Sequence, residues 1–257
     1  MTNVITTTGQ GRDLVLIHGW AMHGGIFAPL ADLLSAHFRV HRVDLPGHGN
    51  HRDFAPGALD PLVCARAIAA STPPAIWLGW SLGGLVALQG ALDDPAQVRG
   101  IIEVACSPRF VIGDDWPHGV AASVFAEFAA ALETRFETAI ERFLALETLG
   151  SPHAREELRT LRAHVFARGA PVPAALHEGL AILDRSDLRA SLADLRVPSL
   201  WIAGRRDRLV VPAAMQWAAA HGAHSEYLEL AAGHAPFLSH APAMTDAILR
   251  FADRVPA

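Results

Sequence analysis

The sequence predicts an α/β fold with a mostly parallel central sheet, helices on both faces, and an inserted all-helical cap. Three observations support this prediction. Short β-branched runs alternate with helical stretches in the first hundred residues and again near the C-terminus. The stretch between them has apolar residues at helical spacing and no strand-like run. The chain of 257 residues is long enough for one large domain, or for one domain with an insertion.

Buried strands are predicted where apolar residues run continuously, as in a sheet that is covered on both faces. These segments are Leu14–Ile17, Val40–Asp44, Ile76–Gly79, Ile101–Ala105, Ser199–Ala203 and Glu226–Leu230. Helices are predicted at Ile26–Ala36 and Leu82–Leu92, and a closing helix at Ala243–Val255. This alternation of strands and helices is typical of βαβ units in a parallel sheet.

The cap is predicted at residues 108–185, between the core segments 1–107 and 186–257. Apolar residues recur at every fourth position from Val120 to Leu144. This spacing advances about 40° per step around a helix, so the stripe would wind more than halfway round a single helix. We therefore expect a break near Thr134 that separates two helices, followed by helices at Ala154–Ala167 and Ala174–Asp184.

The composition excludes several classes of protein. With 51% hydrophobic and 18% charged residues, the chain is neither disordered nor a coiled coil. The net charge of −5 argues against general nucleic-acid binding, and all 21 basic residues are arginine. No signal peptide is evident, no apolar run reaches the roughly 18 residues of a membrane span, and the two cysteines lie in apolar runs. We expect a soluble, cytoplasmic protein that binds no nucleic acid and no membrane.

A candidate nucleophile lies at the end of one predicted strand. Residues 79–83 fit the G-x-S-x-G pattern and join the strand that ends at Gly79 to the helix that begins at Leu82. This is the setting of a nucleophile elbow, a sharp turn that exposes a serine hydroxyl. We predict that Ser81 is the nucleophile and that Gly79, Gly83 and Gly84 are needed because a Cβ would crowd the turn or the helix packing. The alternative is an ordinary glycine-rich turn.

A serine nucleophile needs a base and an orienting acid, and in this setting they follow it in the order acid, then histidine. His234 is the candidate base because it follows the last predicted strand, and His240 is its rival at the start of the closing helix. Asp207 is the candidate acid because it follows the strand before that, whereas Asp187 and Asp194 precede that strand. No carboxylate directly follows the fourth predicted strand. The alternative for Asp207 is a surface turn paired with an arginine.

The backbone amides of Trp20 and Leu82 are the candidate donors of an oxyanion hole. Leu82 directly follows the nucleophile, and Trp20 follows the first predicted strand. The alternative for Trp20 is a core aromatic, whose packing would still leave its amide available. Asp44 is predicted to be structural, with its carboxylate bonded to local backbone amides.

Five segments together resemble the α/β-hydrolase superfamily over essentially the whole chain. They are HGW at 18–20, DLPGHG at 44–49, GWSLGG at 79–84, DRLVVP at 207–212 and GHAPFLSH at 233–240. More narrowly, the sequence is similar to the pimeloyl-[acyl-carrier protein] methyl ester esterases of biotin synthesis. The segments specific to this likeness are AIWLGWSLGGLV at 75–86, ERFLAL at 141–146 and GHAPF at 233–237.

The resemblance implies a serine carboxylesterase that cleaves the methyl ester of a pimeloyl chain tethered to its acyl-carrier protein, and also small esters. It implies a monomer that needs no metal or organic cofactor. The catalytic residues would be Ser81, Asp207 and His234. The alternative for Phe143 is a core residue of the cap. The substrate-binding residues that the resemblance implies are Trp20, Leu82, Phe143, Leu146, Glu147 and His234.

The family also uses cap arginines to bind the acidic carrier protein, and the matching positions here are Arg142, Arg155, Arg159 and Arg162. The last three are spaced to share one helix face, and arginine suits carboxylate and phosphate partners. Thr138 departs from the expected pattern, since a basic residue is expected there, and Arg135 is a substitute. The alternative is a solvated helix face paired with nearby glutamates, namely Glu141, Glu156 and Glu157.

Other functions stay open at this point. A general short-chain carboxylesterase would share the chemistry but would have no carrier partner, and thioesterase activity is compatible with the same fold. Dehalogenases and epoxide hydrolases are disfavoured, because they would have Asp where Ser81 stands. A non-catalytic binding module would tolerate loss of a catalytic residue, but candidates for all of them are present in the expected order.

Overall fold

The computed structural model describes residues 4–256. Within them, seven strands form one sheet, whose order from edge to edge is β1 (Ile5–Thr8), β3 (Phe38–Val43), β2 (Arg12–Ile17), β4 (Ala75–Trp80), β5 (Val98–Val104), β6 (Ser199–Gly204) and β7 (Ser225–Leu230). β1 pairs antiparallel with β3, and the other neighbouring pairs are parallel. The mostly parallel sheet is confirmed, and each predicted strand overlaps one of β2–β7. Strand β1 was not predicted, because three of its four residues are threonines and so form no apolar run. It lies at a half-exposed edge of the sheet, where apolar residues are not required.

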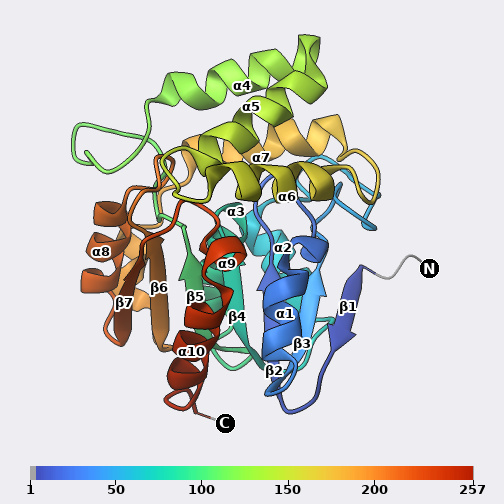
Figure 1. Ribbon diagram of the computed structural model, residues 1–257. Helices are drawn as coiled ribbons and strands as arrows, with labels where there is room; N and C mark the ends of the chain where they lie inside the picture. Colours follow the sequence, from blue (N-terminus) through green and yellow to red (C-terminus); the bar gives the residue numbers. More distant parts are fainter. Residues whose placement is uncertain (1–3, 257) are drawn as a thin grey trace.

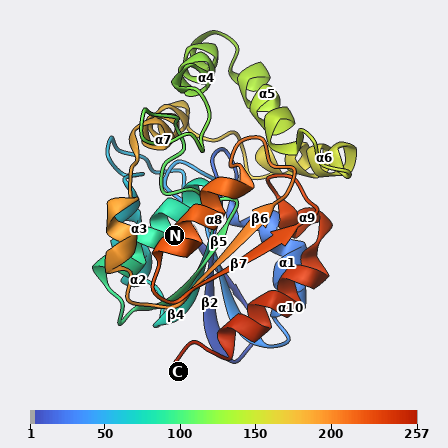
Figure 2. The same ribbon diagram turned by 90° about the vertical axis from the view of Figure 1, so that its left-hand side faces the viewer.

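Helices cover both faces of the sheet (Figure 2). On one face, α1 (Ala28–Leu34), which follows the 3-10 turn η1 (Gly24–Phe27), packs beside α9 (Pro236–Ser239) and α10 (Ala241–Ala252). On the other face lie α2 (Pro61–Ala69), α3 (Leu82–Asp93) and α8 (Pro212–His221). Helix α2 was not predicted, although Asp60 caps its first amides and Pro61 opens it.

The helical layer, as we call α4 (Ala122–Thr134), α5 (Phe136–Thr148), α6 (Ala154–Val165) and α7 (Pro173–Arg185), lies between β5 and β6 in the chain. It covers the carboxyl ends of the parallel strands (Figure 1), and the 3-10 turn η2 (Ala190–Asp194) leads back to β6. The predicted break is confirmed, since α4 ends at Thr134 and α5 begins at Phe136. No helix within residues 4–256 is both long enough and apolar enough to cross a membrane.

A buried carboxylate joins the helical layer to the loops above the sheet. Asp44 accepts hydrogen bonds from the backbone amides of Gly24 at 2.8 Å and Asn50 at 2.7 Å. Arg168, which follows α6, donates from Nη1 to both carboxylate oxygens, at 2.8 and 3.1 Å. The structural role predicted for Asp44 is therefore confirmed, and the arginine that completes it comes from 124 residues further along the chain.

Candidate active site

Ser81 lies in the sharp turn between β4 and α3. Its backbone has φ of 54° and ψ of −118°, in a left-handed region that a residue with a Cβ rarely adopts. Such a conformation costs about 1–3 kcal/mol and persists only where the surroundings enforce it. Here the Ser81 amide donates to the carbonyl of Val104 at 3.0 Å, and the Ser81 carbonyl accepts from the amide of Gly84 at 2.9 Å. The turn therefore has the strained geometry of a nucleophile elbow.

Close backbone approach explains the glycines of this turn. A Cβ on Gly79 would clash with the carbonyl of Gly83, and a Cβ on Gly83 would clash with the carbonyl of Ile17 at the end of β2. A Cβ on Gly84 would clash with the side chains of Glu103 and Cys106 on and after β5. The predicted need for glycine is confirmed, because Gly79 and Gly83 face backbone carbonyls and Gly84 faces two fully buried side chains.

The loops after β6 and β7 bring Asp207 and His234 together. His234 Nδ1 donates to Asp207 Oδ2 at 2.7 Å, and both side chains are fully buried. The other carboxylate oxygen, Oδ1, accepts from the amides of Leu209 at 2.8 Å and Val210 at 3.0 Å. Burial lowers the pKa of His234, but attraction and hydrogen bonding by Asp207, together with Glu147, outweigh it and raise the pKa overall. A surface salt bridge for Asp207 is thus excluded.

Strand β4, which ends directly before Ser81, is also hydrogen-bonded to the backbone of His234. The Trp80 indole donates to the backbone carbonyl of His234 at 2.8 Å, and the two rings lie 5.8 Å apart. Ser81 Oγ and His234 Nε2 are both buried, and neither has a hydrogen-bond partner among the described residues. Since Nδ1 holds its proton toward Asp207, Nε2 is left as an acceptor. Catalytic hydrogen bonds are often long before substrate binds.

The rival acid Asp187 and the rival histidine His240 have other partners. Asp187 pairs with Arg189 at 2.7 Å, in a group that also contains Asp115. His240 directly precedes α10, as predicted, and its Nδ1 contacts Ser239 Oγ at 2.9 Å.

The loop after β2 lies directly against Ser81, the candidate nucleophile. A Cβ on Gly19 would lie 3.3 Å from the Cβ of Ser81. Trp20 is the next residue, so its backbone amide also lies close to Ser81. Leu82 is the first residue of α3, and its amide has no partner within the helix. The Trp20 ring is fully buried and its indole donates to the carbonyl of Leu176 in α7 at 2.9 Å. Trp20 is thus a core aromatic in its side chain, and the role of its amide stays a prediction.

His18 fixes this loop, a role that was not predicted from the sequence. Its Nε2 accepts from the amide of Leu45 at 2.9 Å, so its proton is on Nδ1, which donates to the carbonyl of Gly19 at 2.8 Å. Burial, together with the neighbouring His48, lowers the pKa of His18 to about 3, which keeps the ring neutral. The position of His18 directly after a predicted strand was the feature of the sequence that could have indicated this role.

The helical layer contributes an apolar wall. Phe143 of α5 is fully buried, with its ring centroid 4.4 Å from Trp20 and 5.2 Å from Phe128 of α4. Leu146 is partly buried against the same core. One turn beyond Phe143 along α5, Glu147 is 1% exposed, and neither of its carboxyl oxygens has a partner among the described residues.

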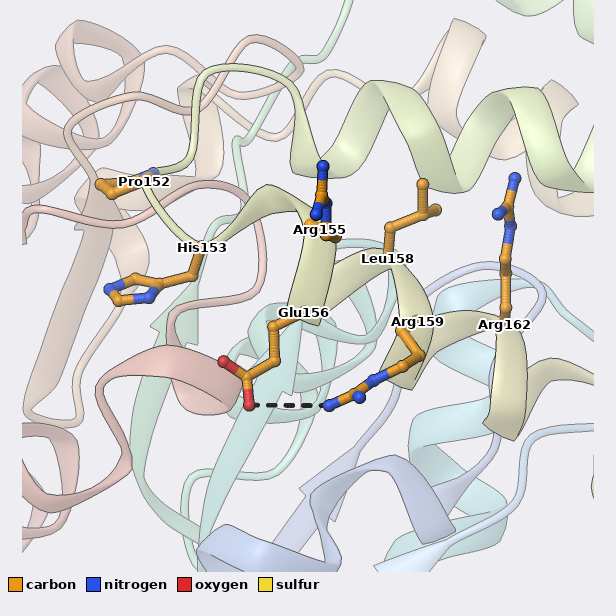
Figure 3. A pocket seen from close by; sticks show the side chains of 7 residues that line it. All are labelled: Pro152, His153, Arg155, Glu156, Leu158, Arg159 and Arg162. Carbon is orange, nitrogen blue, oxygen red and sulfur yellow. Dashed lines mark ion pairs between the residues drawn. The ribbon is translucent and has the colours of Figure 1, made fainter.

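Three of the four arginines predicted to bind a carrier protein, Arg155, Arg159 and Arg162, line a shallow hollow of about 670 Å³ on α6 (Figure 3). Arg155 and Arg162 point the same way, whereas Arg159 turns toward Glu156 at 3.9 Å. Arg162 lies 3.9 Å from Glu141, and Arg142 is exposed on α5. Two of the three glutamates suggested as partners are therefore nearby, but the third, Glu157, is 2% exposed and unpaired within residues 4–256.

Comparison with known proteins agrees with this geometry. The Alpha/beta hydrolase family matches residues 14–247. A pimeloyl-[acyl-carrier protein] methyl ester esterase from Xanthomonas oryzae pv. oryzae is 54% identical over 98% of this chain and 99% of its own length. One from Stenotrophomonas maltophilia is 55% identical over 96% of this chain and 95% of its own length.

Solved structures show the same fold at lower identity. An esterase from Exiguobacterium antarcticum superimposes with a TM-score of 0.86 at 20% identity, covering 97% of this chain and 94% of that one. An enol-lactonase from Burkholderia xenovorans LB400 has a TM-score of 0.83 at 21% identity, covering 97% and 96%. The chain therefore belongs to the alpha/beta hydrolase family and, within it, to the family of pimeloyl-[acyl-carrier protein] methyl ester esterases.

Proposed function

We propose that this chain is a serine esterase that hydrolyses the methyl ester of a pimeloyl chain attached to its acyl-carrier protein, releasing methanol. One observation carries the proposal: a buried histidine–aspartate pair, bonded at 2.7 Å, is held by Trp80 beside the strained Ser81. The relatives that are 54–55% identical over nearly the whole chain bear the name of this reaction. A monomeric state and a cytoplasmic location stay predictions.

Each catalytic residue has a role in two steps. His234 Nε2 takes the proton of Ser81 as the oxygen attacks the ester carbonyl, and returns it to the methoxide oxygen, so methanol leaves. The acyl group is then on Ser81. A water molecule gives His234 a proton and attacks the acyl-serine, and the proton goes back to Ser81 as the free acid departs. Asp207 keeps the imidazole in the required tautomer, and the amides of Trp20 and Leu82 bind the oxyanion.

The acyl chain would lie against the wall that the helical layer supplies. Phe143 and Leu146 offer apolar surface next to Trp20, and Glu147 ends this stretch of α5. Residues 108–185 would act as a cap over the core formed by residues 1–107 and 186–257, because α4–α7 cover the strand ends where Ser81 lies.

The carrier protein would dock on the arginines of the helical layer. Arg142, Arg155 and Arg159 are exposed, and the ion pairs of Arg159 and Arg162 are long, at 3.9 Å each. Exposed pairs of this kind contribute about 0–1 kcal/mol, so an acidic partner displaces them at little cost. The hollow beside them in Figure 3 offers an arginine-rich surface to such a partner.

The test compares methanol release from pimeloyl-carrier methyl ester with hydrolysis of p-nitrophenyl butyrate. Arg155→Glu/Arg159→Glu should lower kcat/KM for the carrier substrate about tenfold or more and leave butyrate hydrolysis unchanged. The matched control is Arg196→Glu/Arg250→Glu, which reverses two exposed arginines outside α4–α7, one before β6 and one in α10. If the wild-type protein cleaves only the small ester, the proposed carrier-bound substrate is refuted. The chain would then be a general carboxylesterase.

A further inference from the structure

The helical layer reaches the candidate active site at two places. At the end of α5, the carbonyl of Glu147 accepts a hydrogen bond from the amide of His234 at 3.2 Å. On α7, a Cβ at Gly179 would lie 2.7 Å from Cδ1 of Trp20 and 3.5 Å from Cδ2 of Leu82. Helix α7 therefore packs against the side chains of both candidate oxyanion donors.

The Trp20 ring is held on α7 by a hydrogen bond and by close packing. Its indole donates to the carbonyl of Leu176 at 2.9 Å, and the ring is fully buried. Leu176 and Gly179 are three positions apart, so they lie on the same face of the helix. Glycine is unfavourable in the interior of a helix, but a larger side chain at position 179 would clash with the ring. The close approach of the Trp20 ring thus explains this glycine.

The backbone directly after Trp20 is strained. Ala21 has φ of 62°, in the left-handed region that a residue with a Cβ rarely adopts. The amide of Met22 donates to the carbonyl of Gly19 at 3.3 Å, so residues 19–22 form a tight turn in which Ala21 is the third residue. A positive φ at this position of a turn normally selects glycine or asparagine. Such strain persists only where the surroundings enforce it, so contacts outside the turn must hold it.

We propose that Gly179 and the carbonyl of Leu176 position the candidate oxyanion donor by anchoring the Trp20 ring on α7. The anchored ring keeps the strained 19–22 turn in the conformation that directs the Trp20 amide toward the oxyanion. The other side of the turn is held by His18, which donates to the first carbonyl of the turn at 2.8 Å. This inference rests on the proposed function, in which the Trp20 amide binds the oxyanion.

The first test removes the hydrogen bond to α7 and keeps an aromatic ring. An oxyanion forms in both steps of the reaction and is absent from the bound ester, so a displaced amide affects kcat and not KM. Trp20→Phe should therefore lower kcat for p-nitrophenyl butyrate about tenfold or more and change KM less than about threefold. The matched control is Trp116→Phe, because the buried Trp116 indole also donates to a backbone carbonyl, that of Arg109, at 2.9 Å. An unchanged kcat in Trp20→Phe, or an equal fall in both variants, would overturn the proposal.

The second test acts from α7 and leaves Trp20 itself unchanged. Gly179→Ala places a Cβ against the Trp20 ring, so it should lower kcat in the same way and again leave KM nearly unchanged. Gly90→Ala is the matched control, because a Cβ at this position of α3 would lie 2.8 Å from Cζ3 of the buried Trp77. Its kcat should equal that of the wild type. Equal kcat values for the wild type and a folded Gly179→Ala protein would contradict the anchoring role of α7.

A third variant separates positioning from general damage to the fold. Glycine adopts a positive φ without a steric cost, so Ala21→Gly allows the turn to keep its conformation without the anchor. Trp20→Phe/Ala21→Gly should therefore recover at least part of the kcat that Trp20→Phe loses, and no recovery would refute the anchor as the support of the strained turn. A Ser81→Ala protein that still hydrolyses the ester would instead overturn the proposed function, and this inference with it.

Discussion

Asp207→Asn tests how the proposed triad is oriented. Because Asp207 Oδ1 accepts from the amides of Leu209 and Val210, the introduced carboxamide must direct its oxygen there and its NH2 group toward His234. An NH2 group cannot accept the Nδ1 proton over the present 2.7 Å contact. The imidazole proton then moves to Nε2, the atom that takes the Ser81 proton in the proposed mechanism, so that transfer is blocked.

The expected loss follows from this change of tautomer. A wrong tautomer with the geometry intact lowers kcat by about 10⁴, which corresponds to about 5.5 kcal/mol in the barrier. Stability should fall by less than about 2 kcal/mol, because the two amide bonds to Oδ1 are kept. The assay is kcat for p-nitrophenyl butyrate beside a thermal denaturation curve, with Asp187→Asn as the exposed control. A variant that retains more than about a tenth of the activity would refute the orientation by Asp207.

Three further outcomes are expected. Arg168→Met removes both hydrogen bonds to the buried Asp44 and should lower the free energy of unfolding by about 2–3 kcal/mol, measured by urea denaturation; an unchanged midpoint would contradict this. Glu147 keeps its proton in the folded state up to about pH 8 but releases it near 4.5 when unfolded, so stability falls as pH rises through this window. Glu147→Gln should therefore gain up to about 1.4 kcal/mol per pH unit between pH 5 and pH 8 over the wild type, and parallel stability curves would exclude the buried neutral acid. Phe143→Ala removes a buried ring from Trp20 and should cost about 3–5 kcal/mol, with a loss below about 1 kcal/mol showing that the wall is loosely packed.

The candidate site could be predicted where local geometry and chain order decide it. Ser81, Asp207 and His234 each follow a strand, and the carboxyl ends of parallel strands meet at one edge of the sheet. The glycines next to Ser81 could be predicted for the same local reason, since a tight turn leaves no room for a Cβ. The catalytic roles themselves stay predictions.

The features that could not be predicted from the sequence depend on contacts between distant segments. The pairing of Asp44 with Arg168 brings together residues 124 positions apart, and no local pattern encodes it. The alternative interpretation of α6 put Glu157 on a solvated face, yet Glu157 is buried on the stripe that also contains Leu161 and Val165. That four-residue spacing was a usable signal, which its charge concealed.

The main chain of His234 is bonded on both sides to different parts of the fold. Its carbonyl is fixed by Trp80 of the central sheet, and its amide is fixed by the end of α5 in the helical layer. A displacement of the end of α5 would remove one of these two backbone bonds. The placement of the candidate base therefore depends on the helical layer as well as on the central sheet, so substitutions in α5 can affect a residue that lies outside that layer.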